Sequence, residues 1–341
     1  MRKKYFDLKK LNKDQKILLV IFIFFIAVFL AGFYLPKSIA KADIVPFAVK
    51  KGTDYRQIGA ELSSQGIIRS PLFFDFYTII SLSFSRLQAG IYDLSPSDSV
   101  AEIVSKIANG DTAKNKVTII EGWDIGDIAQ YFDQKKIYQK QDFINATKQD
   151  FSADFTFFKD KPKNSYLEGY IFPDTYYLAG VNTSEDFLKI VLSNFDQKLT
   201  PDLRDAISKQ HKTIFQIVTM ASMLEKEVQS LGDKKIVAGI LWKRIKEGIP
   251  LQVDATVNYA TRNTSGKTSI DDTKIDSPYN TYKYYGLPLG PISNPGMDSI
   301  MAAIYPTETD YFYYLSVPGT GQTVFSKTLD EHNANVAKYL K

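Results

Sequence analysis

The sequence contains no cysteine and only two histidines among its 341 residues. The lack of cysteine excludes a disulfide framework, a thiolate metal site and a cysteine nucleophile. His211 and His332 lie far apart and match no spacing of metal ligands. We therefore expect neither a metal nor another cofactor.

Several sequence motifs of catalysis and nucleotide binding are also missing. There is no G-x-S-x-G elbow, no P-loop and no strand-linked G-x-G-x-x-G, and neither histidine has an evident serine partner. Serine hydrolases and nucleotide-binding enzymes are thereby disfavoured. An enzyme that cleaves carbohydrate is compatible with the sequence, because it needs only carboxylates and polar positioning groups.

The net charge of +4 comes from the N-terminus. Of 42 basic and 38 acidic residues, seven basic and two acidic ones precede residue 17, which leaves 35 against 36 in the rest of the chain. A surface that binds nucleic acid needs a basic excess. The sequence therefore predicts no nucleic-acid partner.

The segment Ile17–Leu35 is apolar and carries no charge. Its length is close to the ~20 residues that cross a bilayer as a helix. Because the basic residues precede it, we expect residues 1–16 to form a cytoplasmic tail and 17–36 a single-pass anchor in the cell membrane, with the rest outside the cytoplasm. A cleaved signal peptide ending near Ala40–Ala42 is the alternative, but its apolar region would be shorter, about 7–15 residues.

A repeat with an offset of 70 residues follows the anchor. Phe47–Phe74 and Val117–Ile144 share apolar, glycine and aspartate positions. Each copy predicts a short strand, a glycine turn and an amphipathic helix followed by a second short helix. This order resembles the LysM-type βα unit, a small fold associated with glycan binding. The alternative is a βα unit that serves only as scaffold, and the sequence does not decide between the two.

These patterns predict an α+β protein with a transmembrane helix, a LysM-like small domain at 44–114 and a mixed α/β catalytic domain at 115–341. The catalytic domain includes the second LysM-like unit at 117–145. Its helical patterns cover about 184–198, 213–229, 233–247 and 297–304, and two strands and a helix with a capping box end the chain. The segment 250–296 is rich in Pro, Gly, Asn and Tyr and has little periodicity, which is typical of a binding surface.

One glutamate stands out in the helix predicted at Thr213–Gln229. Glu225 follows Ala221 by four residues and therefore lies on the apolar stripe of this helix, whereas Glu227 points to the opposite side. Desolvation raises the pKa of a carboxyl group, as a general acid near neutral pH requires. From periodicity alone, a surface cluster of charges at the helix end is the favoured explanation of the pattern.

Six blocks together resemble the endolytic murein transglycosylase family (YceG-like), in the family's order and over roughly residues 45–341. The blocks are Leu167–Tyr176, Ala221–Glu227, Leu251–Tyr259, Ser277–Tyr282, Gly286–Gly296 and Phe325–Asn333. The chain departs from the family pattern at Ala255, where proline is usual, at Val253, where Ser or Thr is usual, and at Trp123.

The resemblance implies a fold with a helix-borne catalytic glutamate, Glu225, which protonates the glycosidic oxygen between MurNAc and GlcNAc. The same carboxylate then takes the proton of the MurNAc C6 hydroxyl as a 1,6-anhydro ring closes, so no second carboxylate is needed. The implied substrate is nascent peptidoglycan, and the implied role is to set strand length or end elongation. Peptidoglycan synthases of growth or division are the expected protein partners.

Polar residues and tyrosines in these blocks are candidates for substrate binding. They are Glu168, Gln252, Asp254, Thr256, Tyr259, Tyr279, Asn280, Thr281, Tyr282 and Asn294. The alternative for the loop residues is that they only stabilise turns. Glu168 or Asp174 could also orient Glu225 or activate water, which would make the protein a muramidase-type hydrolase. A non-catalytic glycan-binding scaffold protein is a further alternative.

Overall fold

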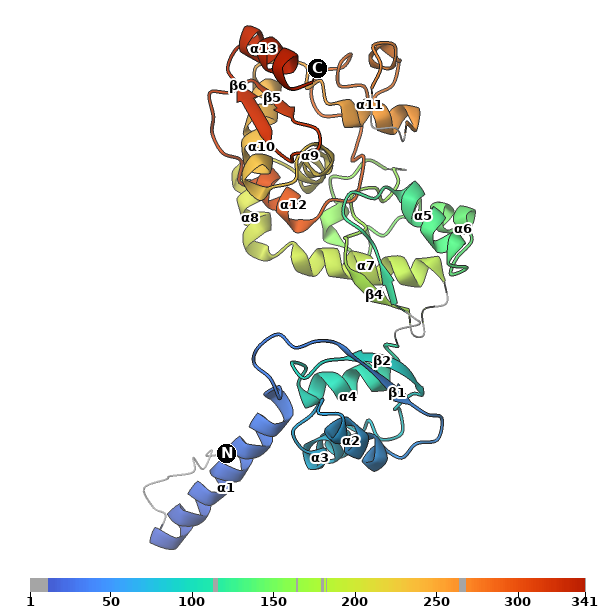
Figure 1. The fold of residues 1–341 in the computed structure, drawn as a ribbon, viewed down its shortest axis with the longest axis vertical. Helices are drawn as coiled ribbons and strands as arrows, with labels where there is room; N and C mark the ends of the chain where they lie inside the picture. Colours follow the sequence, from blue (N-terminus) through green and yellow to red (C-terminus); the bar gives the residue numbers. More distant parts are fainter. Residues whose placement is uncertain are drawn as a thin grey trace, which may run out of the picture. The chain divides into compact units, whose positions relative to one another are not determined.

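The computed structural model separates the chain into two compact units that we describe independently (Figure 1). Unit 1 comprises residues 1–117 with 177–180, and unit 2 comprises 118–176 and 181–341. The structure describes residues 12–112, 116–163, 165–178, 181, 183–263 and 268–340. The sequence-based boundary between 114 and 115 falls three residues before the end of the first segment of unit 1.

Helix α1 (Lys13–Tyr34) is long and apolar enough to cross a membrane, and 6% of its most apolar window is buried within the protein. It begins four residues before the apolar run, because Asn12 and Gln15 form a capping box that satisfies the first free N–H groups. Most of the predicted cytoplasmic tail, residues 1–11, lies outside the described residues.

The remainder of unit 1 has the order β-α-α-β-α. Its elements are β1 (Val45–Val49), α2 (Tyr55–Ser64), α3 (Pro71–Ile80), β2 (Gly90–Leu94) and α4 (Val100–Asn109). Strands β1 and β2 pair antiparallel, with Phe47 opposite Tyr92. Both side chains are buried with Ile58, Leu62 and Phe74 in one apolar core. Helix α4 is capped by Gly110, which adopts the left-handed conformation that glycine tolerates best.

The predicted repeat is confirmed as a structural repeat. The second copy consists of β3 (Lys116–Thr118), α5 (Ile125–Gln134), α6 (Lys140–Ala146) and β4 (Thr175–Tyr177), and β3 pairs with β4. Gly52 and Gly122 turn the chain with φ of 84° and 81°, and the aspartates two residues later cap α2 and α5. Glycan binding by either copy stays a prediction.

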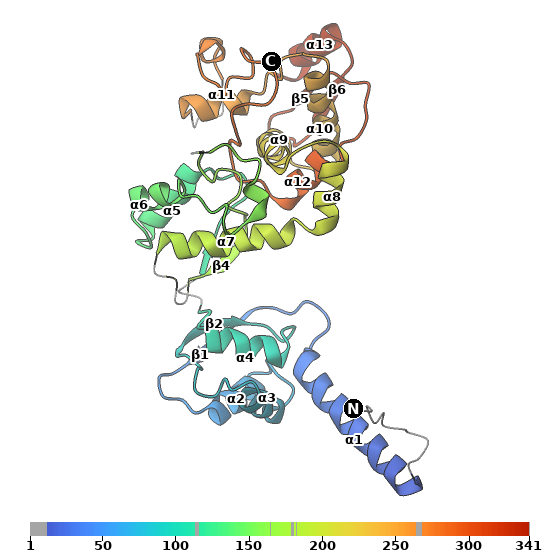
Figure 2. The ribbon, with the colours of Figure 1, turned by 180° about the vertical axis from the view of Figure 1, so that it is seen from behind.

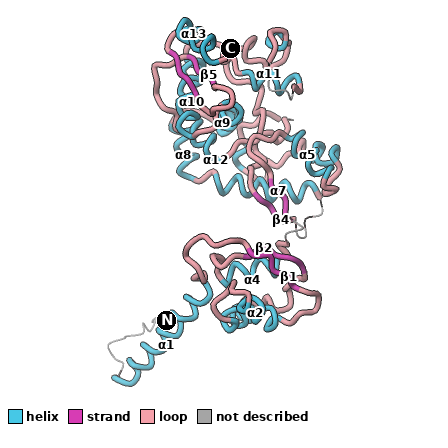
Figure 3. The backbone as a smooth tube through the Cα atoms, in the orientation of Figure 1, coloured by secondary structure: helices cyan, strands magenta, loops and turns pink. Residues whose placement is uncertain are grey.

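The rest of unit 2 is mainly helical and has only short strands (Figure 3). Its elements are η3 (Thr156–Phe158), α7 (Ser184–Lys198), α8 (Pro201–Lys209), α9 (Ile214–Glu227), α10 (Leu231–Lys246), α11 (Asp254–Thr261), η4 (Asp272–Lys274), α12 (Met297–Ile304), β5 (Tyr313–Ser316), β6 (Thr323–Ser326) and α13 (Leu329–Tyr339). Helix α9 is surrounded by α8, α10, α11 and α12, as Figures 1 and 2 show from opposite sides.

The surroundings of α9 correct two expectations. The helix is buried on all sides from Ile217 to Leu224. It therefore does not have one apolar stripe and an opposite polar face, as its sequence pattern predicted. It also ends at Glu227, two residues earlier than predicted, because Val228 leaves the helical conformation. Helices α8 and α11 were not predicted, whereas α7 and α12 have the predicted bounds.

Candidate active site

Ser222 in the middle of α9 fixes a distant segment of the chain beside the helix. Its hydroxyl oxygen accepts a hydrogen bond from the N–H of Ile292 (3.0 Å), and its carbonyl accepts one from the hydroxyl of Ser293 (3.0 Å). The small residues of the A-S-x-x-E-K-E motif thus hold residues 292–296 against α9. This places the backbone of Gly296 next to Glu225 at the helix end.

Glu225 is held by three neighbours. Its carboxylate forms an ion pair with Lys234 on α10 (2.9 Å) and accepts hydrogen bonds from the N–H of Gly296 (2.9 Å) and the hydroxyl of Ser299 (2.7 Å). The side chains of Glu225 and Lys234 are 9% and 5% exposed. A carboxylate with this many partners is fixed in position beside the Lys234 ammonium.

Glu227 has a different environment on the other side of the helix end. Its carboxylate accepts hydrogen bonds from the hydroxyl of Tyr314 on β5 (3.0 Å) and the N–H of Ala255. Burial raises the pKa of Glu227 to about 7, the charge of Asp254 adds to this, and the two hydrogen bonds oppose it. By whole-residue exposure Glu227 is partly buried, as is Glu225. A general acid at neutral pH needs a raised pKa of this kind.

Arg244 on α10 organises the loop that faces Glu227. Its guanidinium donates hydrogen bonds to the carbonyls of Pro250 (3.2 Å), Leu251 (2.8 Å) and Phe312 (3.0 Å). The side chain is buried and lies over the ring of Tyr313. One planar cation therefore joins the loop before α11 to the segment before β5, and both carry neighbours of Glu227.

The loop before α11 is also bound to a segment about 30 residues further along. Thr281 accepts a hydrogen bond from the N–H of Val253 through its hydroxyl (3.0 Å) and one from the N–H of Gln252 through its carbonyl (3.1 Å). Its hydroxyl lies 3.0 Å from that of Thr256, and Tyr282 donates to the Asp254 carboxylate (2.5 Å). Four predicted site residues and Thr281 thus meet at one place, close to Glu227.

Exposure divides this group into two kinds of side chain. Gln252 and Asp254 are exposed, and Gln252 adopts a positive φ of 55°. Thr256, Thr281 and the neighbouring Asn280 are buried, and the Asn280 amide donates to the carbonyls of the 273–275 turn. The buried residues hold the loop in shape, and Gln252 and Asp254 are exposed to solvent.

The remaining predicted residues form a second network around Glu168. This buried carboxylate accepts hydrogen bonds from the N–H of Ile125 (3.1 Å), the Asn294 amide (3.0 Å) and the Tyr259 hydroxyl (3.2 Å). The ring of Tyr259 packs against that of Tyr279 at 5.0 Å. Burial raises the pKa of Glu168 to about 8, and the hydrogen bonds from Ile125 and Tyr259 oppose this rise.

Asn294 joins this network to the end of α9 through the second repeat. Its amide oxygen accepts from the N–H groups of Gly169 and Ile171, and its nitrogen also donates to the carbonyl of Trp123 (2.9 Å). The Asn294 carbonyl accepts from the N–H of Gly122 (2.9 Å), and a Cβ placed on Gly122 would lie 3.6 Å from Cγ of Glu225. The glycine turn of the second copy is therefore packed against the predicted acid.

Asp174 lies elsewhere in unit 2. It lies within the Leu167–Tyr176 block, directly before β4, and its carboxylate accepts hydrogen bonds from the Asn194 amide (3.0 Å) and the Thr175 N–H. Lys198 of α7 is 3.8 Å away. These contacts join β4 to α7, whereas Glu225 has its partners on α10 and α12.

Sequence reasoning missed Glu227, Tyr314, Arg244, Lys234 and Ser299. Glu227 is the second glutamate of the E-K-E motif, but helical periodicity placed it on the side opposite the apolar stripe, where exposure is expected. Glu227 is covered by Tyr314 of β5, which is 87 residues away in the sequence, and by the start of α11, which is about 30 residues away. Lys234 and Arg244 are two of several basic residues of α10, and no local pattern distinguished them from the others.

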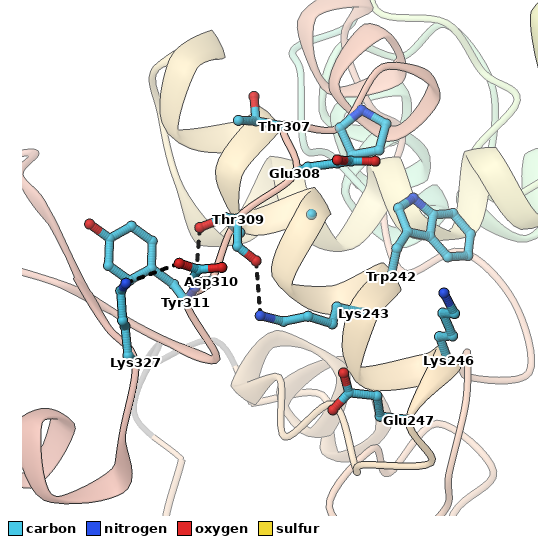
Figure 4. A pocket seen from close by; sticks show the side chains of 12 residues that line it. Trp242, Lys243, Lys246, Glu247, Thr307, Glu308, Thr309, Asp310, Tyr311 and Lys327 are labelled. Atoms are coloured by element: carbon cyan, nitrogen blue, oxygen red, sulfur yellow. Dashed lines mark hydrogen bonds and ion pairs between the residues drawn. The ribbon is translucent and has the colours of Figure 1, made fainter.

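A cavity of about 870 Å³ lies along the C-terminal half of α10 (Figure 4). Trp242 and Lys243 line it from the helix, and the 306–311 segment and Lys327 line it from the opposite side, where Lys327 pairs with Asp310 (3.0 Å). It includes none of the predicted site residues. In the described part of the chain, no group of three or more His, Asp or Glu side chains is arranged to hold a metal ion.

Comparison with known proteins adds independent information. The model of the YceG-like family matches residues 47–338. A Bacillus subtilis protein named endolytic murein transglycosylase is 34% identical over 305 aligned residues, which cover 86% of this chain and 84% of the relative. A Streptococcus pneumoniae protein of the same name is 28% identical, and the alignment covers 95% of this chain and 65% of that relative.

A solved structure is similar as well. The crystal structure of a YceG-like protein from Listeria monocytogenes aligns with a TM-score of 0.60 and 32% sequence identity. The alignment covers 86% of this chain and all of that structure.

Proposed function

Because the chain belongs to the YceG-like family, as its sequence blocks predicted, we propose that it is an endolytic lytic transglycosylase of peptidoglycan. It cuts the bond between MurNAc and GlcNAc within glycan strands and leaves a 1,6-anhydro-MurNAc end. The names of the relatives support the reaction class. The observation that carries the proposal is a glutamate with a pKa near neutrality at the end of α9, facing the loop that exposes Gln252 and Asp254.

One carboxyl group is sufficient for this reaction. The protonated acid donates its proton to the glycosidic oxygen as the bond from C1 of MurNAc to that oxygen breaks, and GlcNAc leaves with a free hydroxyl. The resulting carboxylate removes the proton of the C6 hydroxyl of MurNAc, whose oxygen then bonds to C1 and closes the ring. The carboxyl group is protonated again, and water is not consumed.

We assign the acid/base role to Glu227 and give Glu225 a supporting role. Both belong to the E-K-E motif, and Glu225 was the residue predicted from the sequence. Glu225 already has Lys234, Gly296 and Ser299 as partners, which hold its carboxylate in place. Glu227 has a pKa of about 7 and lies close to the exposed Asp254, and so provides a proton at neutral pH.

The proposed setting is the outer face of the cell membrane. Helix α1 is long and apolar enough to serve as a single-pass anchor, and the basic residues before it favour a cytoplasmic N-terminus. There the enzyme meets nascent strands and acts beside peptidoglycan synthases, where it sets strand length. Co-purification of synthases from membranes tests the last part.

The decisive experiment compares Glu225→Gln and Glu227→Gln in the full-length protein with nascent strands as substrate. Mass spectrometry of the products should find internal fragments with 1,6-anhydro ends for wild type and none for Glu227→Gln. Glu225→Gln should retain part of the activity and unfold at a lower temperature, because it leaves the buried Lys234 without its counter-charge.

The other outcomes separate the alternatives. Full activity of Glu227→Gln combined with a folded, inactive Glu225→Gln would return the role to Glu225. Reducing ends in place of anhydro ends would indicate a hydrolase and direct attention to Asp254, Glu168 and Asp174. Intact strands with every folded variant, wild type included, would favour a glycan-binding scaffold protein.

A further inference from the structure

Helix α3 in unit 1 exposes an apolar surface that its own unit does not cover. Leu72, Phe76, Ile79 and Ile80 have the spacing of one helical stripe, and Leu82 and Phe84 continue it beyond the helix end. All six are exposed, Ile80 at 61% and Leu82 at 70%. We call these six residues the α3 surface. Monomeric soluble proteins rarely expose a contiguous apolar patch of this kind without a partner.

The opposite face of α3 has conventional packing. Phe74 is fully buried in the core of unit 1. Asp75, which is the only charged residue of α3, is directed toward Gly59 of α2, where an added Cβ would lie 2.9 Å from the carboxylate oxygen. The charge therefore points into the protein, and the outward stripe is left purely apolar.

A third face of α3 packs on the last turns of α1. The ring of Phe76 lies 5.3 Å from that of Phe29, and the ring of Tyr77 lies 5.3 Å from that of Phe33. Between them, Phe73 covers Gly32 so closely that an added Cβ would collide with its ring. The C-terminal part of α1 and α3 therefore run side by side, and the α3 surface continues the apolar surface of α1.

Hydrogen bonds fix this arrangement. The Arg69 guanidinium donates to the carbonyl of Pro36 (2.8 Å), and the Lys37 ammonium donates to the carbonyl of Gly66 (2.7 Å). The N–H of Ser38 donates to the carbonyl of Pro96 (2.8 Å). The chain leaving α1 is thereby bound to three places in unit 1, so the position of α1 in a bilayer also determines the position of α3.

The geometry of α1 gives the depth of α3 in the bilayer. At about 1.5 Å per residue, the apolar run from Ile17 to Leu35 spans ~28 Å, close to the ~30 Å of a hydrocarbon core. Phe29 precedes the end of α1 at Tyr34 by five residues, or about 8 Å. The partner of Phe29, Phe76, is thus at the level of the acyl chains, and not above the headgroups.

We propose that the α3 surface is inserted into the outer leaflet, so that unit 1 is held by the membrane through two helices, α1 across it and α3 in its surface. Amphipathic helices that lie in an interface bury their apolar face by roughly 5–10 Å, which matches this depth. The proposal rests on α1 crossing the membrane, as proposed above, but not on the reaction of unit 2.

The absence of cysteine makes a direct test simple. Single cysteines are introduced in the full-length protein at Ile80 on the α3 surface, at Gln57 on the exposed side of α2 as matched control, and at Val28 in α1. Each is labelled with bimane in vesicles of phosphatidylcholine and phosphatidylglycerol. Quenching is then measured with nitroxide on the lipid acyl chains and with iodide in the water.

We expect acyl-chain nitroxide to quench the labels at Ile80 and Val28 severalfold more than the label at Gln57, and iodide to quench only Gln57. Equal quenching of the Ile80 and Gln57 labels by iodide would overturn the proposal. Protection of the Ile80 label from both quenchers would overturn it too, since protein would then cover the surface. A Val28 label open to iodide would remove its premise while leaving the reaction of unit 2 untouched.

Discussion

Two glutamates at the end of α9 differ in their surroundings although they stand two residues apart. Successive residues of an α-helix are rotated by about 100°, so Glu225 and Glu227 point about 200° apart. Glu225 meets a buried ammonium, and Glu227 meets a tyrosine hydroxyl and a half-buried loop. This difference is the basis of the proposal that Glu225 fixes the helix end and that Glu227 carries the proton.

The assignment of Glu227 predicts the pH profile. A general acid is active when protonated, so kcat/KM on glycan strands should fall as the pH rises through about 7. The hydroxyl of Tyr314 stabilises the ionised form of Glu227 and so lowers the pKa of this carboxyl group. Tyr314→Phe removes that hydrogen bond and should move the basic limb to higher pH.

Tyr313→Phe is the matched control, because its ring, stacked on His332, is retained in the variant. Its basic limb should coincide with that of wild type. The same limb in wild type and Tyr314→Phe, or an equal shift in both variants, would contradict the role of Glu227.

Glu168 predicts how stability depends on pH. Its pKa of about 8 in the folded protein exceeds the ordinary value of 4.5, so the folded state binds more protons than the unfolded state between these values. Stability therefore falls as the pH rises from about 4.5 to about 8. Glu168→Gln removes this titration and should become more stable relative to wild type over that range. Unfolding temperatures of wild type and Glu168→Gln are compared at several pH values. A difference between the two proteins that stays constant from pH 4.5 to 8 would contradict this prediction.

At the scale of elements, α9 explains why the site was only partly predictable. Ordinary amphipathic patterns identified its position, as they did for α7 and α12, because apolar spacing and caps are local signals. The helix is enclosed on all sides, however, and an enclosed helix does not reveal by periodicity which of its polar residues is functional. The E-K-E motif could be located from sequence, but the neighbours of each glutamate could not.

Helix α11 was not predicted for a similar reason. Its eight residues contain little apolar periodicity, and it is held by contacts with Thr281 and Arg244 that no local pattern shows. The candidate residues from Gln252 to Tyr282 were selected by resemblance. Only the structure separates those that are exposed from those whose polar atoms are engaged inside the protein.

Ser222 offers a test of how elements are joined. Ser222→Ala removes the acceptor of the buried N–H of Ile292 and should destabilise the protein by about 1–3 kcal/mol, the cost of an unsatisfied buried group. Ser208→Ala on the exposed side of α8 is the control and should change stability little. The unfolding temperatures of both variants are compared with that of wild type. Equal unfolding temperatures of Ser222→Ala and wild type would mean that this hydrogen bond is dispensable.

At the scale of the whole molecule, anchor and site belong to different units. Unit 1 contains α1 and the α3 surface, whereas unit 2 contains the glutamates, the exposed loop and the second copy of the repeat. Cutting the chain after residue 36 would remove α1 and uncover Phe73 and Tyr77 next to the α3 surface.

The shortened chain should therefore self-associate in solution. Serine at both Phe76 and Ile80 should restore a monomer, because these exposed side chains do not contribute to the core. Analytical ultracentrifugation gives the answer. A shortened chain that is monomeric without the serines would show that the apolar surface is covered by other parts of the protein.

The glycine turns of the repeat have one more implication. A Cβ on Gly52 would meet nothing within 4 Å, whereas one on Gly122 would face Glu225, and the N–H of Gly122 is bonded to Asn294. If the copies arose by duplication, selection then acted on them unequally. The turn of the second copy would then be constrained by its contacts with Glu225 and Asn294, whereas the turn of the first copy has no such contact. Across relatives, the turn around Gly122 should accordingly have changed more slowly than the turn around Gly52.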